Sequence, residues 1–241
     1  MTNGLIVSNP ISIARLVQSA RATSAEGALG EAVYVSLSPG TVPNGNQAIL
    51  RRVGAASSVA TMVSGGGFDP VPVTAQAGDS LDVTVVSSGG DTLYQQRVLV
   101  LASRPPVVVR TEPPPKKRDV PLNANIVVVF SEPVNGGTIN SSSVQLRHGS
   151  APIAGSVGLL QGAATTAVFT PAAPLDPNGD YQLTVTQAVQ DLQGGPLAAA
   201  DTVDFTTGST TVGTVASVSL GLNDTATVVP LGSQFQLAAT A

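Results

Sequence analysis

The chain of 241 residues contains no cysteine and no tryptophan, and it has a single histidine. Without cysteine there can be no disulfide bonds, thiolate metal ligands or cysteine nucleophiles. One histidine, His148, excludes a histidine-based catalytic triad or a multi-histidine metal site formed within this sequence. We interpret His148 as a solvated turn residue at a strand end, and we expect no catalytic residues and no enzymatic activity.

Charge is also scarce. Charged residues make up 11% of the chain, aromatic residues 3%, and the formal net charge is −4. The one cationic cluster, Lys116 to Arg118, follows three prolines and is interpreted as a solvated linker. Binding to nucleic acid needs clustered cations, so we expect no nucleic-acid partner. No stretch approaches the ~18 uncharged apolar residues of a membrane helix, so we expect no membrane-spanning segment.

Glycine and proline are abundant, with 25 and 18 copies. They separate short stretches in which apolar and polar residues alternate, such as Leu81, Val83 and Val85 in "SLDVTVVS", and the same pattern recurs over 33–37 and 181–185. Such strands bury one face and expose the other. The predicted fold class is all-β, with tandem Ig-like β-sandwich modules joined by Pro-rich linkers.

Two stretches mark module boundaries. Five prolines in "SRPPVVVRTEPPPKKRD", residues 103–119, predict a semi-rigid polyproline-like connector that runs into the first strand of a new module. Small polar residues at 206–214 mark a second boundary. The predicted segments are an N-terminal segment of uncertain structure (1–30), a β-sandwich (31–103), a second sandwich (104–208), and a linker with an incomplete domain (209–241). For the first segment, a short helix, a strand and coil all remain open.

The run "IVVVF" at 126–130 is apolar on both faces. Ile126, Val128 and Phe130 point one way, and the two intervening valines point the other. A strand of this kind belongs in the middle of a sheet or under a covering neighbour. Pro133 in the following "SEPV" cannot donate to a ladder, so we expect the strand to end there.

Residues 105–208 resemble the bacterial Ig-like domain of S-layer and surface proteins, the SbsA-like type. The motifs that carry this resemblance stand in order: "VPLNANIVVVFSEPV", "TINSSSVQLRHG", "TTAVFTPAAPLDPNGDYQLTVT" and "DTVDFTTG". The resemblance implies a spacer or adhesive module without catalytic residues. Residues 213–241 resemble the opening strands of an intimin/invasin-like group 2 bacterial Ig-like domain. Residues 31–103, with "AGDSLDVTV", look like a prealbumin-like module, and a generic Ig-like sandwich is the alternative.

The turn "DPNGD" offers the one candidate metal site. Asp176, Asn178 and Asp180 could supply the hard oxygen ligands that calcium prefers. In the competing interpretation, these side chains accept hydrogen bonds from their own turn, since such residues favour turns for that reason. No EF-hand loop is present, and no other cofactor is expected.

These observations predict a non-enzymatic structural or adhesive module of a bacterial extracellular or cell-surface protein, acting as spacer, stalk or scaffold. Its expected partners are proteins or cell-surface components, including further copies of itself through strand pairing. One alternative is a filament subunit in which 213–241 donates a strand to a neighbour. Another is an accessory module of a secreted hydrolase whose catalytic domain lies outside this chain. The N-terminus shows no signal peptide, so an export signal would lie upstream.

Overall fold

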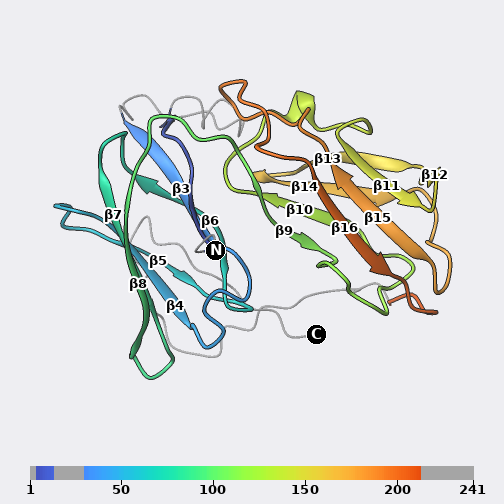
Figure 1. Cartoon of the computed structure of the whole chain (residues 1–241), viewed down its shortest axis with the longest axis horizontal. Helices are drawn as coiled ribbons and strands as arrows, with labels where there is room; N and C mark the ends of the chain where they lie inside the picture. Colours follow the sequence, from blue (N-terminus) through green and yellow to red (C-terminus); the bar gives the residue numbers. More distant parts are fainter. Residues whose placement is uncertain (1–3, 14–29, 213–241) are drawn as a thin grey trace, which may run out of the picture. The chain divides into compact units, whose positions relative to one another are not determined.

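The computed structural model describes residues 4–13 and 30–212, and strands dominate these residues (Figure 1). Contacts divide the chain into a compact unit, residues 1–211, and a second unit, residues 212–241. The first unit contains two hydrophobic cores, each enclosed by a pair of antiparallel sheets. The predicted all-β fold class is confirmed.

The first sandwich is built from eight strands. In one sheet, β3 (Glu31–Leu37) pairs with β1 (Leu5–Val7), β2 (Ile11–Ser12) and β6 (Phe68–Thr74). The other sheet has the order β5 (Val59–Met62), β4 (Gln47–Arg52), β7 (Ser80–Val86) and β8 (Thr92–Leu99). The predicted alternation in β7 places Leu81, Val83 and Val85 in the core, where all three are fully buried.

The N-terminal segment contributes to this sandwich. Leu5 lies opposite Leu37, and Ile11 lies opposite Ala32, so β1 and β2 both add to β3. Strand is therefore the correct alternative for residues 5–7 and 11–12. Residues 14–29 lie outside the described part of the chain.

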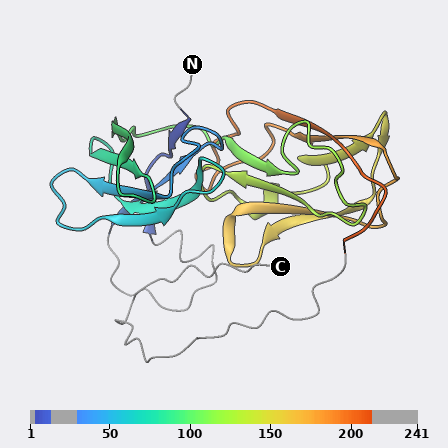
Figure 2. The ribbon, with the colours of Figure 1, turned by 90° about the horizontal axis from the view of Figure 1, so that it is seen from below.

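The second sandwich also has two sheets of four strands. One has the order β13 (Gly155–Leu160), β14 (Ala163–Pro171), β10 (Ile126–Phe130) and β9 (Val108–Glu112). The other has the order β12 (Ala151–Pro152), β11 (Val144–His148), β15 (Asp180–Val185) and β16 (Asp201–Thr206), and a 3-10 helix, η1 (Gly136–Thr138), precedes β11. Figure 2 shows the yellow β13–β14 hairpin and the red end of β16 in different layers.

β10 is the central strand predicted from its two apolar faces. It pairs with β9 on one side and β14 on the other. Ile126, Val128 and Phe130 are fully buried in the core. The strand ends at Phe130, three residues before Pro133, as the sequence predicts.

The predicted polyproline-like connector over 103–119 is wrong in its middle. Residues 108–112 form β9 and pair with β10, so this stretch belongs to the second sandwich. The three consecutive valines before Arg110 favour a strand, and the prolines lie only at its two sides. After Pro113 the chain leaves β10 and continues beside β16.

Candidate functional site

The segment that follows β9 runs parallel to the last strand of the second sandwich. A parallel bridge joins Val120 to Thr207. The backbone hydrogen bonds join Lys116 N to Asp204 O (2.7 Å), Thr206 N to Lys117 O (2.9 Å), Val120 N to Thr206 O (3.1 Å), Gly208 N to Val120 O (2.8 Å) and Leu122 N to Thr210 O (3.0 Å). We call residues 116–122 together with 204–210 the terminal clamp. It ties the beginning of the second sandwich to its end.

Local backbone geometry lets the segment follow β16. Lys116 and Asp119 both have positive φ, 63° and 57°, which bends the chain back toward the strand. The end of β16 is braced by the nearby turn, because the Thr207 hydroxyl donates to Asp176 O (2.6 Å) and accepts from Gly179 N (2.8 Å). The "KKR" triplet is thus fixed through its backbone while its side chains stay exposed.

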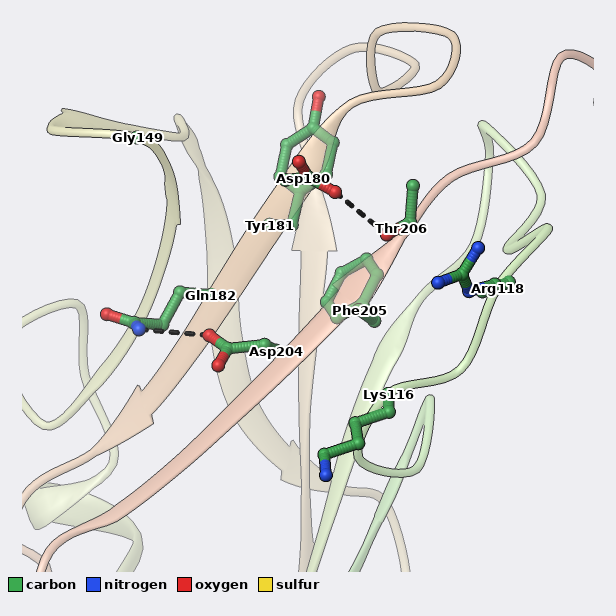
Figure 3. A pocket seen from close by; sticks show the side chains of 9 residues that line it. All are labelled: Lys116, Arg118, Gly149, Asp180, Tyr181, Gln182, Asp204, Phe205 and Thr206. Carbon is green, nitrogen blue, oxygen red and sulfur yellow. Dashed lines mark hydrogen bonds between the residues drawn. The ribbon is translucent and has the colours of Figure 1, made fainter.

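An open pocket of about 520 Å³ lies between the clamp segment and the sheet. Figure 3 shows Lys116 and Arg118 on one side and side chains of β15 and β16 on the other. The Asp204 carboxylate accepts from Gln182 (2.9 Å), and the Asp180 carboxylate accepts from Thr206 (2.8 Å). Cationic and anionic side chains are mixed here, so the pocket does not select ligands of one charge.

The three calcium candidates lie within residues 176–180, at the turn that leads into β15, and both of their carboxylates already have partners. Asp176 Oδ2 lies 3.3 Å from His148 Nδ1, and Asp180 accepts from Thr206. Asn178 adopts positive φ, 54°, as its place in the turn requires. Within residues 4–13 and 30–212, no three His, Cys, Asp or Glu side chains are grouped to hold a metal. Calcium binding at this turn stays a prediction.

His148 stands at the end of a strand, as predicted, but the prediction that it is a free turn residue is wrong. It ends β11 opposite Tyr181 of β15, and the two rings stack with centroids 4.8 Å apart. Tyr181 stacks in turn on Phe205. The His148 side chain is 39% exposed, so one ring face is covered while its edge reaches Asp176. The cross-strand register creates this contact, and no local sequence pattern encodes it.

The four sheet edges of the second sandwich differ in how they are protected. β9 carries Arg110 and Glu112, β12 contains Pro152, and the terminal clamp covers β16. β13, with the sequence "GSVGLL", has neither charge nor proline, although one register irregularity interrupts its pairing with β14. Exposed uncharged edges of this kind are templates for pairing with another strand.

One buried polar group was missed from the sequence. Glu132 follows β10 and is fully buried, close to Asp191 and Asn9, which are also buried. The neighbours of Glu132 come from distant parts of the chain. The local motif "SEPV" therefore predicts the end of a strand but not the burial of Glu132.

One comparison with known proteins matches the residues of the second sandwich. Residues 102–207 match the family model described as bacterial Ig-like domain. No curated protein matches the chain. Among the described residues, no helix has both the length and the apolar character needed to cross a membrane.

Several solved structures align with parts of the chain at low identity. The N-terminal part of the bacterial S-layer protein SbsC aligns with a TM-score of 0.34 and 18% identity over 43% of this chain and 23% of that chain. PcoC, a copper resistance protein from Escherichia coli, gives 0.34 and 18% over 42% and 97% of the two chains. Dimeric latent PorU from Porphyromonas gingivalis gives 0.31 and 9% over 74% and 22%. The aligned part of this chain thus spans less than a quarter of the SbsC fragment.

Proposed function

Because residues 102–207 match the family model described as bacterial Ig-like domain, we propose that the chain is a non-enzymatic spacer or scaffold in a bacterial extracellular or cell-surface protein. The Ig-like sandwich is a fold without catalytic machinery of its own, and function in such folds resides in sites placed upon them. The carboxylates of the pocket beside the clamp are paired with Gln182 and Thr206. The terminal clamp is the observation that carries this proposal.

The clamp suits a module that transmits force. A pull on the two ends of the second sandwich draws the segment 116–122 and the segment 204–210 in opposite directions along parallel strands. All five clamp hydrogen bonds are then loaded together in shear, whereas a hairpin would open one bond at a time. Each bond contributes only about 1 kcal/mol net, so their simultaneous loading gives the module its resistance.

Side-chain contacts between the sandwiches support a fixed spacing. Arg110 of β9 donates two hydrogen bonds to the Asp69 carboxylate of β6, at 2.6 and 2.7 Å. This pairing raises the pKa of Arg110. The Gln193 side chain donates to Pro10 O at 2.9 Å. Contacts of both kinds restrict motion about the connection between β8 and β9.

The force-bearing role is tested by single-molecule unfolding of the full chain. Val120→Pro removes the N–H that donates to Thr206 O, so we expect a marked drop in the unfolding force of the second sandwich. Val157→Ala in β13 is the control, because this side chain packs against the same core outside the clamp. The proposal fails if the two variants lower the force equally at equal loss of unfolding free energy.

The β13 edge favours a second candidate function, self-association by strand addition. In this proposal an extended segment of another copy pairs with β13, and the donor predicted from the sequence, 213–241, lies outside the described residues. Gly158→Lys places a charge on the edge strand and should abolish polymers seen by light scattering, as should deletion of 213–241. Ser142→Lys, at an exposed turn, is the control. A wild-type chain that stays monomeric at high concentration contradicts this candidate.

A further inference from the structure

A buried carboxyl group lies where the N-terminal loop of the first sandwich meets the Ig-like domain. Glu132 is 0% exposed, and Asn9, in the loop between β1 and β2, is 6% exposed. The neighbouring Asp191 is 3% exposed, but its Oδ1 already accepts from the N–H groups of Gln193 (2.7 Å) and Gly195 (2.8 Å). A carboxyl group as buried as Glu132 must either be neutral or be well paired.

The Asn9 amide is the group that faces Glu132. One terminal atom of this amide lies 2.8 and 3.0 Å from the two Glu132 carboxyl oxygens and 3.0 Å from Arg104 O. The other terminal atom contacts Gln193 Oε1, and Gln193 Nε2 donates to Pro10 O at 2.9 Å. A chain of hydrogen bonds therefore runs from Glu132 through Asn9 and Gln193 to Pro10.

The direction of this chain depends on one proton. With neutral Glu132, its O–H donates to Asn9 Oδ1, which faces Arg104 O without a hydrogen bond. Asn9 Nδ2 then donates to Gln193 Oε1, and Gln193 Nε2 donates to Pro10 O. With ionised Glu132, the Asn9 amide turns over so that its Nδ2 donates to the carboxylate and to Arg104 O. Gln193 must then turn over to donate to Asn9 Oδ1. Its own oxygen would face Pro10 O, so the Pro10 contact is lost.

We propose that Glu132 is a proton-controlled latch, which holds the Asn9–Pro10 loop on the Ig-like domain through Gln193 when protonated and releases Pro10 when ionised. Burial, followed by the negative charge of Asp191, raises the pKa of Glu132 to about 8. Among the residues that the structure describes, Asp191 is the charged side chain whose field acts on Glu132. Asn9 and Gln193 are neutral, and Arg104 contributes its backbone carbonyl. The latch should therefore change state in weakly alkaline solution.

The test is an NMR titration of the full chain between about pH 5 and pH 10. The carboxyl carbon of Glu132 and the side-chain amide groups of Asn9 and Gln193 are followed together. We expect all three to change with one midpoint near pH 8. In Glu132→Gln, whose amide donates permanently to Asn9, the two side-chain signals should stay constant over this range. A Glu132 that titrates near its ordinary value, or without changing the two amides, overturns the proposal.

Two further measurements test how the charge of Asp191 and an added cation act on Glu132. Asp191→Asn keeps an oxygen for the Gln193 and Gly195 N–H groups but removes the charge, so it should move the midpoint to lower pH. Asp91→Asn, in the exposed turn before β8, should leave the midpoint unchanged.

The wild-type titration is repeated with calcium chloride. A saturable calcium effect on the Asn9 signal that Glu132→Gln abolishes would make the converging oxygens a cation site and would overturn the latch.

Discussion

The two sandwiches have similar architectures but stabilise them differently. The core of the first consists mainly of valine, alanine and leucine, and its charged network of Arg51, Asp82 and Arg97 lies on an exposed sheet face. The second has four aromatic side chains in its core, and it buries Glu132 and Asp191. The family model matches only the second. Regular alternation of small apolar residues is thus enough to build a sandwich, and four core aromatic side chains and two buried carboxyl groups distinguish the second from the first.

The largest expected effect tests whether the sandwiches are energetically separate. Phe130→Ala removes a fully buried ring from the second core and should cost about 3–5 kcal/mol in the free energy of unfolding. Leu50→Ala, at a fully buried position of the first core, should cost about 2–5 kcal/mol. Urea titrations followed by NMR signals from each sandwich are the measurement. If either variant shifts both transitions equally, the sandwiches unfold as one unit and are not energetically separate.

The second prediction is that the two sandwiches depend on pH with opposite signs. The pKa of Glu132 rises from 4.5 to about 8 in the folded state, so between these values the folded chain holds a proton that the unfolded chain has lost. The free energy of unfolding of the second sandwich should therefore fall as pH rises through this window, by up to about 1.4 kcal/mol per pH unit. Glu132→Gln should flatten the profile.

In the first sandwich the relevant group is Asp82. A hydrogen bond from Arg97 holds the pKa of Asp82 below its usual range, so its contribution to stability is lost as pH falls through that lowered pKa. Thermal melts of Asp82→Asn in acid should show a smaller loss than the wild type. If the free energy of unfolding changed with pH in the same direction in both sandwiches, this prediction would be wrong.

A third, smaller effect concerns the turn at residues 176–180 of the second sandwich. Tyr181→Phe removes the hydroxyl that accepts from Asp176 N at 2.7 Å, and this should cost about 1 kcal/mol. Chemical denaturation of the second sandwich is the measurement. Tyr34→Phe removes a hydroxyl from the first sandwich and should leave the second transition unchanged. An unchanged transition in Tyr181→Phe would show that water replaces the phenol without loss.

The smallest expected effect is at the ion pair between the sandwiches. The Asp69 side chain is 52% exposed, so Asp69→Asn should weaken the contact with Arg110 by only about 0.2–1 kcal/mol. A double-mutant cycle with Arg110→Gln measures this coupling. It should shrink in about 1 M salt, where exposed charges are screened. Coupling that is independent of salt would indicate that the pair acts mainly through packing.

The sequence predicts the elements of the fold better than their partners. Alternation identifies β7 and β15, and the two apolar faces of β10 predict its central place. By contrast, the stack of His148 on Tyr181 depends on the register of two strands. The contact of Asn9 with Gln193 joins residues 184 positions apart, so no local pattern could reveal the cluster around Glu132. The prolines at 103–119 misled prediction because they flank a strand rather than replace it.

The terminal clamp also has a consequence during protein synthesis. Val203 and Phe205 belong to the core, and the backbone partners of 116–122 extend to Thr210. The second sandwich therefore lacks these core side chains and the clamp hydrogen bonds until its last residues are made. A nascent chain that ends before Asp201 exposes the β15 edge and an open core. The first sandwich, whose last strand ends at Leu99, can close much earlier. We therefore expect the two sandwiches to fold one after the other during synthesis, and the second to stay vulnerable to misassembly for longer.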